Sequence, residues 1–331
     1  MHFSQSPVFS IRLSLLALLT ATLCACGGGG GGGGGNNNPP DRTVNPNQPS
    51  AGHIVIENSN DLAVLDLATL QTRSITPPDT NDDPGLGVSR TGVIADVNSD
   101  FGDGAWKIDL RSLDLGILNT YSAGSVDLLS FATSAAALNA DATLIAFSVN
   151  EMTSTTDDTR IDRIYIANLV THNYVKTIVG FEEPVFIGTG ELLARDDNDR
   201  LFVFDANFAN PQDLQLEVSP KHGSYSASPD GRYIAYDSSS ALHSQITVYD
   251  RNTGNSWLAT DTAVLGCWAP VFSPDGKWLA FLMSGSSAGT WLHIIPFEPG
   301  TTRTITDGDA TEVKTATGDA IWVNASYGWA N

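Results

Sequence analysis

Short runs of β-branched and aromatic residues alternate with clusters of Gly, Asp, Asn and Ser along residues 52–331. No long 3.6-residue periodicity of apolar positions interrupts them, so the pattern predicts strands and turns rather than helices. Runs such as residues 232–238 and 277–283 carry apolar residues at successive positions, which is typical of strands covered on both faces. We therefore predict an all-β domain over residues 52–331.

An internal repeat makes this prediction more specific. Residues 225–236 align with residues 270–281, and both copies contain the turn sequence Ser-Pro-Asp-Gly. In such a turn Pro presets φ, Asp accepts hydrogen bonds from nearby backbone N–H groups, and Gly supplies a positive φ. A period near 40 to 45 residues built from strands is typical of propeller blades. The predicted structural turn residues are Asp230, Gly231, Asp275 and Gly276.

These copies resemble the TolB-type propeller repeat, a WD40-like pattern in which aromatic-Ser-Pro-Asp-Gly precedes an Ile-Ala-Phe strand and then an Ile-Tyr-Val-Asp strand. Residues 246–250 (ITVYD) supply that later strand for the first copy. The resemblance implies four-stranded antiparallel blades, and it extends less closely over the rest of the domain. The weaker copies lie at residues 90–97 with 106–109, residues 139–148 with 163–168, and residues 188–197 with 201–205.

The ends of the third strands predict the number of blades. Their positions give six blades of about 47 residues, and seven blades is the alternative. The first blade, at residues 53–76, lacks an innermost strand, whereas a spare strand remains around residues 320–324. Pairing the two would close the ring and remove exposed sheet edges. The third-strand ends are Asp66, Asp109, Asn168, Asp205, Asp250 and Pro296.

The N-terminal segment, residues 1–26, resembles a bacterial lipoprotein signal. Arg12 precedes an apolar run at residues 13–23, which is shorter than the roughly 20 residues of a membrane-spanning helix, and Leu23-Cys24-Ala25-Cys26 follows. The resemblance implies cleavage before Cys26 and acylation of its thiol, which would anchor the protein in a membrane. An ordinary secretory signal cut nearby is the alternative. Gly27, rather than Asp, favours the outer membrane of the cell envelope by analogy with Gram-negative lipoproteins.

Residues 27–51 predict a disordered tether, because they are almost wholly Gly, Asn, Pro, Asp and Gln and offer little apolar surface to bury.

The formal net charge of −20 argues against a nucleic-acid partner, since an acidic surface repels phosphates. Once Cys24 is removed with the signal and Cys26 is acylated, Cys267 has no partner for a disulfide within the chain. We predict that Cys267 is a buried apolar residue beside Trp268.

Three patterns were considered as sites of chemistry. Residues 285–289 match Gly-x-Ser-x-Gly around Ser287, but no helix pattern follows, so they predict a hairpin loop and no catalytic residue. Asp96, Asn98 and Asp100 begin like a calcium loop, although Phe101 and Lys107 replace the Gly and Glu of an EF-hand. They remain weak Ca²⁺ candidates, as do residues 196–199, with a solvated hairpin tip as the alternative. No other cofactor is predicted.

Metal ligation by histidine would require side chains from several blades to meet at the channel, because no His-x-His or His-Glu-x-x-His spacing occurs. His222, just before an inner strand, is the first candidate, and isolated histidines are the alternative.

Two functions fit these observations. The first is a lipid-anchored envelope scaffold whose propeller binds another envelope protein or a peptide. The second is a propeller enzyme, a lyase or hydrolase, that acts on envelope or extracellular glycans. A group of His, Arg and carboxylate side chains at one end of the channel would favour the enzyme. The few histidines and cations of the sequence disfavour it, so we expect the scaffold. Fold alone does not decide between them, because propellers carry many functions.

Overall fold

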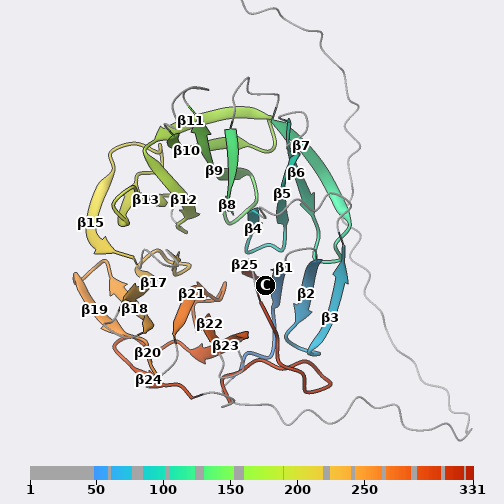
Figure 1. Cartoon of the computed structure of the whole chain (residues 1–331), viewed down its shortest axis with the longest axis vertical. Helices are drawn as coiled ribbons and strands as arrows, with labels where there is room; N and C mark the ends of the chain where they lie inside the picture. Colours follow the sequence, from blue (N-terminus) through green and yellow to red (C-terminus); the bar gives the residue numbers. More distant parts are fainter. Residues whose placement is uncertain are drawn as a thin grey trace, which may run out of the picture. The chain divides into compact units, whose positions relative to one another are not determined.

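The computed structural model describes residues 48–58, 61–76, 85–100, 105–123, 130–152, 160–188, 190–218, 224–239, 243–262, 266–284, 289–306, 310–323 and 326–331. Within the compact unit Val44–Asn331, the strands form a six-bladed propeller whose antiparallel sheets are arranged in a ring (Figure 1). This confirms the predicted fold class and blade number. None of the residues that the structure describes lies in a helix long and apolar enough to cross a membrane.

The first three blades are four-stranded antiparallel sheets. Blades two and three use consecutive strands, whereas the innermost strand of blade one comes from the C-terminal end of the chain. Blade one contains β25 (Ser326–Ala330), β1 (His53–Asn58), β2 (Asp61–Asp66) and β3 (Gln71–Ile75). Blade two contains β4 (Gly85–Val88), β5 (Ile94–Asp100), β6 (Ala105–Arg111) and β7 (Ile117–Ala123). Blade three contains β8 (Ser130–Leu138), β9 (Leu144–Met152), β10 (Arg160–Asn168) and β11 (Asn173–Val179).

The C-terminal half of the ring follows the same plan until its last blade. Blade four contains β12 (Phe181–Phe186), β13 (Leu192–Asp196), β14 (Arg200–Phe204) and β15 (Gln212–Glu217). Blade five contains β16 (Tyr225–Ala227), β17 (Tyr233–Ser239), β18 (Ser244–Asp250) and β19 (Asn255–Leu258). Blade six contains β21 (Cys267–Phe272), β22 (Trp278–Ser284) and β23 (Thr290–Pro296), and a short parallel pair, β20 (Thr260–Asp261) with β24 (Arg303–Thr304), lies beside it.

Side chains on opposite faces of each sheet pack against different neighbouring blades. On β17, Ile234 and Tyr236 belong to the apolar cluster shared with blade four. Tyr233 and Ala235 belong to the cluster shared with blade six, which also contains the fully buried Cys267. This arrangement explains why the strand sequences are apolar at successive positions, because neither face of the sheet meets water.

The two Ser-Pro-Asp-Gly turns have the same hydrogen bonds. Ser228 Oγ donates to Asp230 Oδ1 at 2.6 Å and accepts from the Tyr233 backbone N–H at 2.9 Å. In the second copy, the corresponding distances around Ser273 are 2.7 and 2.9 Å. The glycines that follow have φ values of 71° at Gly231 and 70° at Gly276, a region that side chains other than Gly rarely adopt.

Replacing Gly276 with Val is expected to lower the free energy of unfolding by about 1 to 2 kcal/mol, because a β-branched residue is strained at positive φ. Lys277→Ala is the control, since that side chain is exposed in the same turn. Urea unfolding of both variants provides the measurement. Equal midpoints for the two variants would contradict the turn geometry.

The ring is closed by a strand six residues beyond the predicted one. We expected residues 320–324 to complete blade one, but β25 occupies that position and pairs with β1 from Ile54↔Trp329 to Glu57↔Ser326. Residues 321–323 instead lie along the outer edge of blade six, where the Leu292 backbone N–H donates to the Ile321 carbonyl at 3.0 Å. Both segments are short, apolar and aromatic, so their local sequences do not distinguish the two positions.

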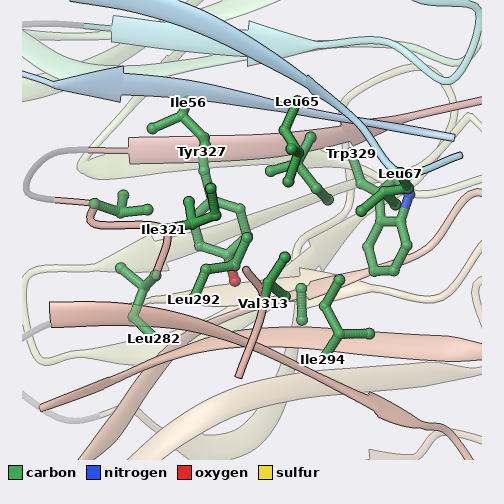
Figure 2. Close-up of a cluster of buried hydrophobic side chains, with 13 residues drawn as sticks. Ile56, Leu65, Leu67, Leu282, Leu292, Ile294, Val313, Ile321, Tyr327 and Trp329 are labelled. Carbon is green, nitrogen blue, oxygen red and sulfur yellow. The ribbon is translucent and has the colours of Figure 1, made fainter. Parts of the chain in front are cut away.

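The closure is buried in an apolar cluster between blades one and six. Figure 2 shows Tyr327 and Trp329 of β25 among Ile56 and Leu65 from blade one and Leu292 from blade six. Tyr327 and Trp329 are 9% and 5% exposed, so most of their surface is removed from water by the ring closure. Burial of this kind is the main favourable contribution to folding.

Candidate functional site

The innermost strands of all six blades surround a cavity of about 240 Å³. Since these strands run side by side around the channel, their first residues meet at one end and their last residues at the other. Many of the lining side chains are aliphatic, and polar groups supply a comparable share of the wall. The lining includes Leu86, Val88 and Arg90 of blade two, Leu138 of blade three, Val185 and Gly188 of blade four, Ser226 of blade five, Val271 of blade six and Tyr327 of blade one.

At the end where the inner strands begin, a group that we call the acidic cluster gathers around one arginine. Arg195 of β13 contacts Glu182 at 2.8 Å, Glu183 at 2.9 Å and Asp199 at 2.9 Å. We include Asp237 of β17, because it lies close enough to affect the same groups. Its charge raises the pKa of Glu183, and the charge of Arg195 lowers the pKa of Asp237. Four carboxyl groups therefore surround one guanidinium group between blades four and five.

Glu183 has an unusual backbone conformation at a bulge in β12. Its φ is 53°, and the pairing of β12 with β13 shifts register between Glu182 and Val185. The Glu183 N–H donates to Ser148 Oγ at 2.7 Å, and its carbonyl accepts from the Tyr225 hydroxyl. Left-handed residues other than Gly cost free energy and persist only where their surroundings hold them.

A bulge residue with positive φ also occurs in blade six. Ala269 has a φ of 52° at a register shift in β21, and its carbonyl accepts from the Tyr327 hydroxyl at 2.5 Å. Both bulge residues precede a proline, at Glu183-Pro184 and Ala269-Pro270. The recurrence indicates that the bulge belongs to the architecture of the inner strands, whereas the carboxylate at Glu183 is particular to blade four.

Burial makes two members of the acidic cluster weak acids. Burial raises the pKa of Glu183 to about 7, and Arg195 only partly opposes this effect. Burial likewise raises the pKa of Asp237 to about 7, although its Oδ1 accepts from the Ser224 N–H at 2.9 Å. Asp237 is fully buried, and its Oδ2 has no hydrogen-bond partner among the described residues. Groups with such pKa values are common at functional sites, because they can exchange a proton near neutral pH.

Asp237→Asn is expected to stabilise the protein at pH 8 by about 1 to 2 kcal/mol and to have little effect near pH 4. The pKa of Asp237 is higher in the folded protein than in the unfolded chain. The folded state therefore binds more protons between pH 4 and 7, and its stability falls as pH rises through this range. Asn stays neutral at every pH and removes that loss. Urea unfolding at both pH values provides the measurement.

Asp250→Asn is the control of opposite sign. The guanidinium of Arg232 lowers the pKa of Asp250 to about 2, so this carboxylate stabilises the fold above its unfolded pKa. Its substitution should therefore destabilise the protein at pH 8. A stability gain in both variants, or a loss in both, would contradict the assigned environments.

The predicted calcium candidates lie in two settings, and one of them, Asp199, belongs to the acidic cluster through its contact with Arg195. The Asp96 carboxylate is buried and accepts from Arg111 Nε at 3.1 Å, and Arg111 also contacts Asp109 at 3.5 Å. The Asp196 carboxylate accepts from the backbone N–H groups of Asn198 and Arg200. In the described part of the chain, no group of three or more His, Cys, Asp or Glu side chains is placed to hold a metal ion.

Several other predicted residues lie outside the described residues. They are Cys26, His222, Ser286, Ser287 and the side chains of Asn98 and Asp100. The hairpin prediction for residues 285–289 falls on residues of which only Gly289 is described, and the strands on either side, β22 and β23, pair from Ser284↔Thr290.

Sequence reasoning missed the acidic cluster as a group. Only Asp199 was a candidate, as a weak calcium ligand within residues 196–199. Glu182 and Glu183 carry no site motif, Arg195 and Asp237 fall inside predicted strands, and no spacing rule connects these elements. The one local signal was the repeated residue-proline pair at the start of an inner strand, which favours an extended or irregular backbone.

Comparisons with known proteins agree with this architecture. No protein-family model and no curated protein matches the chain. Among solved structures, a putative TolB from Agrobacterium tumefaciens matches with a TM-score of 0.53 and 15% identity over 84% of this chain and 98% of the other. The likeness shows a β-propeller fold. A functionally unknown protein from Desulfotomaculum acetoxidans matches with a TM-score of 0.50 and 14% identity over the same shares.

Part of a longer protein is also similar. An acylaminoacyl peptidase matches with a TM-score of 0.50 and 11% identity, over 85% of this chain and 53% of that protein. Proteins with different names thus share this fold, and the function must be argued from the surfaces and groups of this propeller.

Proposed function

We propose that this protein is a lipid-anchored envelope protein whose propeller is a scaffold for a protein partner. The observation that carries the proposal is an apolar outer surface on blades two and three. Of the eight large apolar side chains that are exposed among the described residues, six lie on the outermost strands β7 and β11 or in the turn before β11. These residues are Ile117, Leu118, Val170, Tyr174, Val175 and Val179, and we call them the outer apolar surface.

Such a surface favours binding of another polypeptide. Exposed apolar side chains on two outer sheet edges favour binding, because a partner that covers them removes apolar surface from water, and an outermost strand also presents unpaired backbone N–H and C=O groups. An extended segment of a partner can pair with such an edge and cover its apolar side chains. With a net charge of −20 on this chain, electrostatic attraction favours a basic partner segment.

The test is site-specific photo-crosslinking in cells. A photoreactive residue in place of Val175 on β11 should give one discrete adduct, and the same residue in place of Thr72 on β3, an exposed position on another outer strand, should not. Val179→Lys should abolish the adduct at position 175, because it places a cation on the outer apolar surface. No adduct, an adduct that survives Val179→Lys, or an adduct with a second copy of this chain would each overturn the proposal.

The lipid anchor has its own prediction. Cys26→Ser is expected to abolish labelling with a radioactive fatty acid and to move the protein from the membrane to the soluble fraction, because acyl chains supply the membrane affinity. Cell fractionation and lipid labelling provide the measurements, with Cys267→Ser as the control that keeps Cys26. A Cys26→Ser protein that stays in the membrane fraction would contradict the anchor.

A second candidate function is favoured by the acidic cluster. Glycan hydrolysis uses a pair of carboxyl groups, one of which donates a proton and has a pKa raised toward neutrality. Glu183 and Asp237 both have pKa values of about 7 beside Arg195 at one end of the channel. The test is release of reducing ends or unsaturated products from envelope glycans by the purified protein. Activity that is lost in Glu183→Gln would support the enzyme, and no release would overturn it.

A further inference from the structure

Arg90 reaches across the channel at the end opposite the acidic cluster. It follows β4 in blade two, and its Nη1 donates to the Pro229 carbonyl of blade five at 3.0 Å. Blades two and five face each other in a six-bladed ring, so the side chain crosses the opening. An arginine carries five N–H donors, and this contact uses one of them. Among the described residues, no carboxylate forms an ion pair with Arg90.

This guanidinium group is partly desolvated without a neutralising partner. Burial lowers the pKa of Arg90, and the more distant carboxylate of Asp230 opposes this effect only in part. Asp230 already accepts hydrogen bonds from Ser228 and from the Arg232 backbone N–H within its own turn. A cation that is removed from water and left unpaired is costly, and a bound carboxylate would relieve that cost with two parallel hydrogen bonds.

The cavity next to Arg90 is suited to a small molecule that combines an apolar body with polar groups, because aliphatic side chains and polar groups share its wall. Its walls include Leu86, Leu138 and Val271, and its volume of about 240 Å³ lies below the range typical of drug-sized ligands. Ser226 also lines this cavity, and its buried Oγ has no hydrogen-bond partner among the described residues. A ligand with a second polar group would satisfy that hydroxyl.

A close approach of two blades brings Arg90 to this position. A Cβ atom built at Gly188 would lie 3.2 Å from Arg90 Nη2 and 1.8 Å from the Pro229 carbonyl oxygen. Only glycine therefore fits at position 188, just after β12 of blade four, between the Pro229 carbonyl and the Arg90 guanidinium group. The cation is held at the end of the cavity by backbone from two other blades.

From these observations we propose that the channel binds a short aliphatic carboxylate, with its carboxylate on Arg90 and its apolar body between the inner strands. The carboxylate can belong to a free small acid or to the C-terminal residue of a peptide, because Arg90 recognises the same group in both. This site is independent of the outer apolar surface and of the acidic cluster, so it stands or falls separately from the proposed function.

The experiment is ligand-observed NMR on the full chain purified in detergent. The probes are 4-methylpentanoate, N-acetyl-leucine and the neutral amide of each, which keep the apolar body and remove the charge. We expect binding of at least one acid and a loss of roughly tenfold or more in affinity for its amide, because an amide cannot form the charged pair. Binding of N-acetyl-leucine alone would identify a peptide C-terminus, and binding of 4-methylpentanoate alone would identify a free acid.

Substitution then assigns the binding to Arg90. Arg90→Gln should weaken binding of the acid by roughly tenfold or more, whereas Arg73→Gln, which removes an exposed guanidinium group paired with Asp114, should not. Equal binding of acid and amide, binding of neither acid, or unchanged binding in Arg90→Gln would each overturn the proposal. The comparison of acid with amide uses the unsubstituted chain, so it decides the matter even if Arg90→Gln does not fold.

Discussion

Deletion of residues 326–331 is expected to abolish the cooperative thermal unfolding of the propeller. The deletion removes β25, the innermost strand of blade one, together with the buried side chains of Tyr327 and Trp329. Loss of a buried aromatic side chain costs about 3 to 5 kcal/mol, and two such losses approach the whole stability of a typical domain, about 5 to 15 kcal/mol. The deletion also exposes the edge of β1 and the apolar face of blade six, which favours aggregation.

Circular dichroism melts and size-exclusion chromatography would measure this effect. The matched control is Trp322→Ala, which removes an aromatic side chain from the neighbouring segment, where 47% of the residue is exposed. That variant should remain monomeric and lose little stability. A deleted protein that is monomeric and melts at the same temperature as the full chain would show that the closure by β25 does not stabilise the ring.

Gly188→Ala is expected to lower the free energy of unfolding by about 2 to 3 kcal/mol, the range found when extra atoms are forced into a packed site. The added Cβ would lie 1.8 Å from the Pro229 carbonyl oxygen and 2.9 Å from its carbonyl carbon. Since these are backbone atoms of blade five, no side-chain rotation relieves the contact, and two blades must separate. Urea unfolding monitored by tryptophan fluorescence provides the measurement.

Gly254→Ala is the matched control for that substitution. Gly254 has a φ of 71°, but a Cβ at this position would meet nothing within 4 Å. Its substitution should therefore cost about 1 kcal/mol from backbone strain alone. A loss at Gly188 no larger than the loss at Gly254 would mean that the contact between blades four and five is not held as tightly as the structure indicates.

The fold was predictable because its repeat is local. Ser-Pro-Asp-Gly turns and the strands that follow them each depend on a few neighbouring residues, and the two close and three weaker copies, together with the first blade, give a closed ring. The closing strand was predicted too early, at residues 320–324, because that segment and β25 are both short and apolar. Only the pairing with β1, at the other end of the chain, separates them.

The acidic cluster could not be predicted for the same physical reason. Glu183, Arg195 and Asp237 come from three strands in two blades, and each has an unremarkable local sequence. Their pKa values and ion pairs arise because the fold buries them together between two blades, and the sequence does not show which strands will lie next to each other. Arg90 is similar, since its contact with Pro229 joins blades on opposite sides of the channel.

The position of β25 also sets the order of events in folding. His53 contacts Asn331, a residue 278 positions later, so the contacts that close the ring have a very large separation in sequence. Contacts of this kind form slowly, because a long loop must be closed before they contribute stability. During synthesis, the inner edge of blade one stays unpaired until β25 is available to pair with β1. The time that passes before β25 pairs with β1, rather than the stability of the finished ring, then governs how long the protein is exposed to proteases and to misassembly with neighbouring molecules.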